Sequence, residues 1–144
     1  MRNNVCKGLA RIATIESSKG IAPFSVNAVN NYFQGRTTLS CNNVERLDLN
    51  FRNNTFDCNY PVFFLQNFAK TGKVLFNNNK VTVSTGNGTF MYPPAGKAST
   101  SSMKFERLEI MGNEFHGIKS QNEMVDNITN VKKRKIKSNA FYSK

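Results

Sequence analysis

The chain contains no tryptophan, one histidine and only three cysteines among its 144 residues. Because no two cysteines have CxxC spacing, the sequence argues against a zinc-ribbon site, and an odd count does not build a disulfide framework. Cys58 falls at an inward-facing position of the repeat described below. We therefore predict that Cys58 is a buried thiol that packs as a small hydrophobic side chain.

The sequence also lacks long hydrophobic runs. No apolar stretch approaches the roughly 18 residues that a membrane span requires. Residues 1–6, Met-Arg-Asn-Asn-Val-Cys, lack the apolar segment of a secretory signal peptide. We expect either a protein that is not secreted by this route or a piece of a longer chain. Hydrophobic residues nevertheless make up 39% of the chain and include twelve phenylalanines, which indicates a globular protein.

Acidic residues are scarce. Nine Asp and Glu stand against 20 Lys and Arg, so the formal net charge is +11. Such a balance favours polyanionic partners, among them acidic polysaccharides, nucleic acids and anionic surfaces. The composition also allows an alternative: the positive charge could serve only solubility or protect an exposed sheet edge.

A repeated pattern organises the chain. Residues 47–58 read apolar-x-apolar-x-apolar, then a pair ending in Asn, then alternating apolar positions again. The same pattern recurs with Asn residues 23, 25, 34 and 26 positions apart, and Asn4 marks a sixth copy that is cut short. Self-similarity at this period predicts a solenoid. The key residues of the five complete copies are Asn31, Asn54, Asn79, Asn113 and Asn139.

The period-two alternation before and after each Asn predicts two strands joined by a sharp bend. Asn tolerates the left-handed backbone conformation that such a bend needs. Its side-chain amide can also bond to the equivalent Asn of the next coil, which would form a ladder inside the solenoid. A third, less regular strand is expected in each remaining segment, for example over residues 61–65.

Three short strands per coil with an Asn ladder at one bend resembles the right-handed parallel β-helix of pectate-lyase-like enzymes and phage tailspikes. The resemblance covers about residues 24–143 and implies an all-β solenoid of about five coils. A leucine-rich-repeat solenoid is the alternative, because its period overlaps this one. It is disfavoured because the chain continues as a strand after each Asn and contains only seven Leu.

We predict one β-helix domain over residues 1–144, forming part of a longer chain or of an assembly, for which a trimer is one candidate. Residues 1–23 read either as a helical cap or as a first coil, with the strand interpretation preferred. The 34-residue interval predicts a loop insertion at 84–103. Residues 131–144 form a cationic last coil, whose basic run indicates edge protection more than nucleic-acid binding.

Stacking the copies in register makes one outward face of cations that is relieved by Asp48 and Glu109; its cations are Arg52, Lys73, Arg107, Lys133, Lys135 and Lys137. Within this face we single out Arg52, Lys73 and Arg107. They are the predicted contacts for an acidic polysaccharide, and Tyr92 in the inserted loop could add a ring for sugar stacking. The resemblance implies a carbohydrate-recognising or structural module of a cell-surface, extracellular or phage-virion protein. No complete active site is visible.

The competing function is a polysaccharide lyase acting on an acidic glycan, with Lys73, Arg107 and Arg52 as catalytic candidates. A hydrolase is disfavoured because the outward columns offer no cluster of carboxylates. We expect no cofactor: calcium-dependent relatives cluster Asp residues, whereas this chain has only Asp48, Asp57 and Asp126. His116 is expected to lie two coils from Asp57, too far for a direct catalytic pair.

Overall fold

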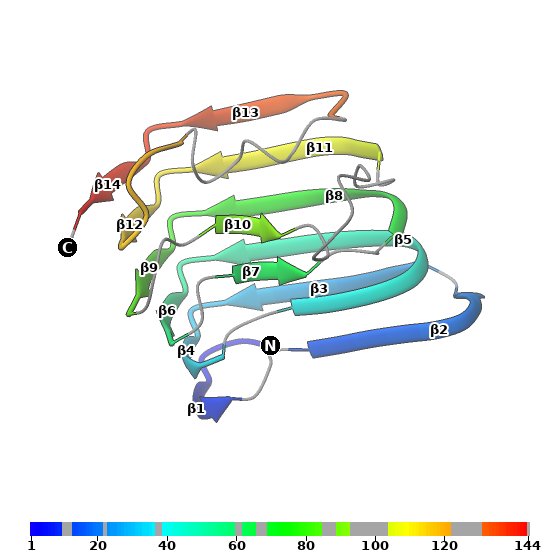
Figure 1. The fold of residues 1–144 in the computed structure, drawn as a ribbon, viewed down its shortest axis with the longest axis horizontal. Coiled ribbons are helices and arrows are strands. Elements are labelled where there is room, and N and C mark those ends of the chain that lie inside the picture. Colours follow the sequence, from blue (N-terminus) through cyan, green and yellow to red (C-terminus); the bar gives the residue numbers. More distant parts are fainter. Residues whose placement is uncertain are drawn as a thin grey trace.

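A computed structural model describes residues 1–9, 13–21, 23–36, 39–59, 62–65, 69–84, 89–92, 104–121 and 131–143. Parallel strands stack in successive levels to form a β-solenoid (Figure 1). The strands belong to two parallel sheets. The fold is therefore the parallel β-helix that the repeat indicates.

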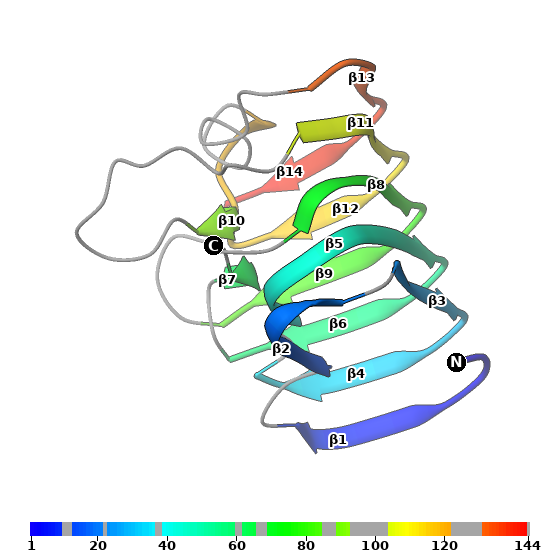
Figure 2. The ribbon, with the colours of Figure 1, turned by 90° about the vertical axis from the view of Figure 1, so that its right-hand side faces the viewer.

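One side of the solenoid is a six-stranded parallel sheet that follows the Asn bends (Figure 2). It has six strands, one more than the five complete copies, because the truncated copy after Asn4 also forms a strand. In spatial order these strands are β1 (Val5–Leu9), β4 (Tyr32–Gly35), β6 (Thr55–Cys58), β9 (Lys80–Val83), β12 (Glu114–His116) and β14 (Ala140–Tyr142).

The second sheet holds the strands that precede each bend, and a short third group of strands joins it. The strands before the bends are β3 (Phe24–Val29), the later part of β5 (Leu39–Arg52), β8 (Ala69–Asn77), β11 (Lys104–Met111) and β13 (Arg134–Lys137). The third group is β2 (Ala13–Ile21), the beginning of β5, β7 (Val62–Leu65) and β10 (Thr89–Tyr92).

Strand β5 runs through a corner of the solenoid without interruption. Its first residues pair with β2 and β7, and its later residues pair with β3 and β8. The same strand therefore belongs to two of the three sides, where the repeat predicted separate strands.

The Asn residues form the predicted ladder inside the bends. Asn54 donates from its backbone N–H and from Nδ2 to Asn79 Oδ1, at 2.9 and 3.0 Å. Asn79 repeats both bonds to Asn113 Oδ1, at 2.8 and 3.1 Å. The second Nδ2 hydrogen of Asn79 bonds to the Phe51 carbonyl at 3.1 Å. The same paired bonds link the whole series Asn4, Asn31, Asn54, Asn79, Asn113 and Asn139.

This arrangement satisfies polar groups that the bend forces into the core. Asn54, Asn79 and Asn113 are at most 2% exposed. Each of their carboxamides accepts two hydrogen bonds and donates two, which is its full donor capacity. A buried amide without a hydrogen-bond partner would lower the stability of the fold. The hydrogen bonds of the Asn side chain therefore stabilise the bend.

The preceding residue at each bend has the left-handed backbone conformation. Asn3, Asn30, Asn53 and Asn78 have φ of 55–56°. The bend thus uses two positions: an outer residue that adopts positive φ and an inner Asn that joins the ladder. The sequence interpretation assigned both properties to the inner Asn, and that assignment is wrong for the backbone conformation.

Phenylalanine rings fill the space between the sheets. Phe33 stacks on Phe56 with ring centroids 5.2 Å apart, and Phe115 stacks on Phe141 at 5.3 Å. Phe76 lies between the two groups, 5.6 Å from Phe56 and 6.3 Å from Phe115. Phe33, Phe56, Phe76 and Phe115 belong to the hydrophobic core, and Phe141 packs against it. Cys58 is also buried, 3% exposed, and is not part of a disulfide, as the repeat predicts for a packed thiol.

The structure resolves two further alternatives. Residues 1–23 contribute strands β1 and β2, so the first-coil interpretation is confirmed over the helical cap. Each bend leads into a strand, which excludes the leucine-rich repeat.

The predicted loop insertion at 84–103 contains a strand. Within this stretch β10 pairs in register with β7, so residues 89–92 form a regular strand; residues 85–88 and 93–103 lie outside the described part.

We expect Asn79→Ala to lower the free energy of unfolding by roughly 3–5 kcal/mol, because it leaves several buried groups at Asn54, Asn113 and Phe51 without partners. Urea denaturation followed by circular dichroism measures the change. Asn78→Gly is the matched control, since Asn78 is exposed and glycine adopts its positive φ. A loss below 1 kcal/mol for Asn79→Ala would contradict the role assigned to the ladder.

Candidate functional site

The predicted outward columns are correct in register. Lys73 pairs with Asp48 on one side and Arg107 on the other, and Arg52 pairs with Asn77. The structure therefore brings Lys73 and Arg107 onto neighbouring strands. Arg52 lies in a different column, nearer the bend.

Two carboxylates accompany the predicted cations. Arg107 forms an ion pair with Glu109, and Asn77 Nδ2 donates to the same carboxylate at 2.7 Å. Lys73 Nζ lies 3.9 Å from Glu106 Oε2. The pairing means that Lys73 and Arg107 do not form an uncompensated cationic row. Their role in ligand binding stays a prediction.

Glu106 is the centre of a larger network that the repeat pattern did not reveal. Arg46 donates two bonds to Glu106, at 2.7 and 3.0 Å, and a third to Asp48 at 3.0 Å. Thr71 Oγ1 lies 3.4 Å from the same Glu106 carboxylate. The network joins three levels of the solenoid through side chains on its outer surface.

A local irregularity explains why Glu106 was missed. The register of β11 against β8 shifts between Phe105 and Arg107, so Glu106 is the extra residue of a β-bulge. Strict alternation cannot assign a bulged residue to either face. The only signal in the sequence is that Phe105 and Leu108, both buried, are three positions apart instead of two.

These contacts shift the pKa values of Glu106, Glu109 and Arg46. The hydrogen bonds from Arg46 are the main reason that the pKa of Glu106 lies below its usual value. Burial raises the pKa of Glu109, but hydrogen bonds from Arg107 and Asn77 outweigh this, and its pKa is also lowered. The hydrogen bonds that Arg46 donates to Glu106 and Asp48 raise the pKa of Arg46. All three groups are charged at neutral pH.

The last coil carries exposed lysines that differ from the cations above in their contacts with carboxylates. We call Lys133, Lys135 and Lys137 the lysine row; all three are exposed. Strand pairing places Lys135 beside Glu109 and Lys137 beside Met111. No ion pair joins the lysine row to a carboxylate among the described residues. Arg134, at an inward position of the repeat, is exposed as well because no described strand covers β13.

The remaining sequence candidates are separate from this surface. Asp57 pairs with Thr82 and Thr82 with His116, so two coils separate Asp57 and His116 as predicted. The His116 ring instead stacks on Tyr142, with centroids 4.6 Å apart. Tyr92 ends strand β10, and its side chain lies outside the described part, so its role in sugar stacking stays a prediction.

Neither a metal centre nor a membrane helix emerges from the described ranges. No three His, Cys, Asp or Glu side chains there are grouped so that they could hold a metal ion. No helix there has both the length and the apolar character to span a bilayer.

The chain matches no protein-family model, no curated protein and no solved structure. The structure therefore shows a parallel β-solenoid, and kinship with pectate-lyase-like enzymes or tailspikes stays a prediction. Fold alone does not specify function, so function must be argued from the side chains.

We expect the stability of the protein to fall as the pH is lowered below about 4.5, in part because of Glu106 and Glu109. Their pKa values are lower in the folded state than in the unfolded state. Their contribution to stability is thus complete above the unfolded value and is lost as the pH falls through the folded values.

Urea denaturation between pH 3 and pH 7 tests this expectation. The double variant Glu106→Gln/Glu109→Gln should show a smaller loss of stability on acidification than the wild type. Glu114→Gln is the matched control, because its carboxylate is half exposed and its nearest cationic groups are 3.7 and 3.9 Å away. Equal acid sensitivity of the double variant and the wild type would contradict the assignment.

Proposed function

We propose that the protein is a binding module for an anionic polymer, and that the lysine row on the last coil is its main contact. The observation that supports this proposal is the contrast between two sets of cations on the same sheet. Arg46, Lys73 and Arg107 are compensated by carboxylates, whereas the lysine row has no such partner among the described residues.

The geometry of the row suits an extended ligand. Alternate residues of a strand lie about 6.6 Å apart on one face, so the three ammonium groups span about 13 Å. At that separation in bulk water each neighbouring pair repels by about 0.6 kcal/mol. This repulsion is too small to disturb the fold. A polyanion lying along the row would relieve it and would release its own counterions.

Among polyanions we favour an acidic polysaccharide. Proteins that bind single-stranded nucleic acids stack bases on aromatic side chains. The described strand partners of Lys135 and Lys137 are instead Glu109 and Met111. Uronate carboxylates, by contrast, need only well-placed cations. Arg52, on the same sheet and exposed, would extend the contact along the solenoid.

The triple variant Lys133→Gln/Lys135→Gln/Lys137→Gln should elute from a heparin column at clearly lower salt than the wild type. The matched control is Lys7→Gln/Lys80→Gln/Lys119→Gln, which removes the same charge from exposed positions elsewhere. The control should elute closer to the wild type. If both triple variants elute at the same salt concentration, net charge alone explains retention and the assigned surface is wrong.

We expect binding without cleavage. Incubation with polygalacturonate or alginate should produce no rise in the ultraviolet absorbance that marks an unsaturated lyase product. The ion pairs of Lys73 and Arg107 support this expectation, because a lyase requires a free base for the α-proton. A rise that disappears in Lys73→Gln or Arg107→Gln would favour the lyase hypothesis instead.

A further inference from the structure

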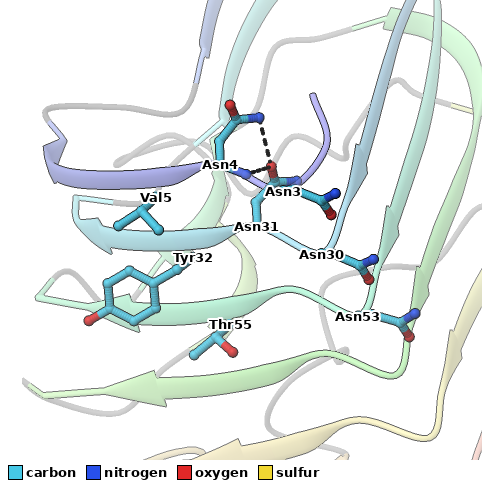
Figure 3. A pocket seen from close by; sticks show the side chains of 8 residues that line it. All are labelled: Asn3, Asn4, Val5, Asn30, Asn31, Tyr32, Asn53 and Thr55. Carbon is cyan, nitrogen blue, oxygen red and sulfur yellow. Dashed lines mark hydrogen bonds between the residues drawn. The ribbon is translucent and has the colours of Figure 1, made fainter.

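A shallow groove of about 370 Å³ lies beside the bends at the N-terminal end of the solenoid (Figure 3). Asn3, Asn30 and Asn53 form one wall, and we call them the outer Asn row. The other wall comes from the strands that follow the bends. Its residues are Val5, Tyr32 and Thr55, and the inner Asn4 and Asn31 complete the lining.

The outer Asn row differs from the inner ladder in one chemical respect. The backbone N–H of each outer residue is bonded, as in Asn30 N–H to the Arg52 carbonyl at 3.1 Å. Their side chains are exposed and make none of the hydrogen bonds found among the described residues. Figure 3 shows the three carboxamides projecting side by side, one per level. Within the part of the chain that the structure describes, three neighbouring amides therefore have donors and acceptors available to a ligand.

Backbone conformation alone does not account for this row. Asn tolerates positive φ, which is a sufficient structural reason for an Asn at any one bend. At the last two levels, however, Gly112 and Ser138 occupy the equivalent positions with φ of 65° and 57°. The bend therefore does not require a carboxamide. Asn also occupies this position at Asn78, which lies outside the groove, and the three that line the groove lie together at the N-terminal end of the solenoid.

The opposite wall is less polar. Val5 is 70% exposed, and Tyr32 is partly exposed. Tyr32 Oη lies 3.3 Å from Asp57 Oδ2 and donates to it, so the ring is anchored at its far end. No residue of the lining carries a charged side chain. The groove thus combines neutral amides with an apolar surface, as small-molecule sites commonly do.

We propose that this groove binds a neutral oligosaccharide. A carboxamide both donates and accepts, so it can bond to a hydroxyl in either direction. A carboxylate or phosphate could use only the donors. Amides on successive levels lie about 4.8 Å apart, a regular series that suits a chain of hydroxyl groups. The C–H faces of the sugar rings would lie against Tyr32 and Val5, where they displace water from apolar surface.

This site is independent of the lysine row. The groove lies at the bends of the first three levels, and the lysine row lies on the second sheet at the last level. The two proposals can therefore fail separately, and a protein carrying both sites would contact two chemically different glycans, or two parts of one.

Nuclear magnetic resonance of the whole, nitrogen-labelled chain tests the proposal through the side-chain NH₂ signals of the outer Asn row. The probes are neutral hexasaccharides of glucose, mannose, galactose and N-acetylglucosamine, with hexagalacturonate as the anionic comparison. At least one neutral probe should shift the Asn30 and Asn53 signals at millimolar concentration, and hexagalacturonate should shift them less.

Asn30→Gly/Asn53→Gly should weaken binding of that probe at least tenfold. Glycine adopts the same positive φ, so the bends are kept while the amides are removed. Asn78→Gly is the matched control, because Asn78 has the same backbone conformation and lies outside the groove. The triple variant of the lysine row should bind the probe normally.

Three outcomes would overturn the proposal. The first is that no neutral hexasaccharide shifts the two amide signals. The second is that Asn78→Gly weakens binding as much as the double variant does. The third is that hexagalacturonate binds as tightly as the neutral probe and that its binding depends on the same two Asn residues.

Discussion

The structure depends on one constraint: every coil must reverse direction at a bend that brings backbone polar groups into a core filled with phenylalanine. Water does not reach these groups, so the protein must satisfy them internally. The Asn ladder does so, and each rung bonds to the levels on both sides. Changing a buried rung therefore affects more than its own coil. The phenylalanine stacks follow the same vertical repetition, because identical positions of successive coils lie directly above one another.

Strict repetition also determines what the surface can do. An outward position of one coil stands beside the same position of the next, so like charges in one column become neighbours and repel each other. In the middle of the second sheet, the carboxylates of Glu106 and Glu109 offset this repulsion between cations. The last coil has no described coil beyond it, and among the described residues its lysines form no ion pair with a carboxylate, although Lys135 lies beside Glu109. These two solutions on one sheet distinguish a structural charge network from a surface that favours an anionic ligand.

Much of the fold could be predicted from the sequence because alternation and the spacing of Asn residues are local and repeated. The inner ladder, the strand after each bend and the outward columns follow from those two signals. The bulge at Glu106 could not be predicted, since one inserted residue removes the alternation that defines a face. The Arg46 network was missed with it. The groove was missed for another reason: its walls come from residues 3–5, 30–32 and 53–55, and each segment alone reads only as a bend.

The uninterrupted strand β5 has a consequence for the order in which the molecule comes apart. In a solenoid each level contacts only its neighbours, so unfolding can begin at either end and advance level by level. Because β5 passes through a corner, it pairs with four other strands, two in the level before it and two in the level after. Opening that corner requires both levels to lose contacts at once. Fraying from the two ends should converge on β5, whose amides would then exchange with solvent last.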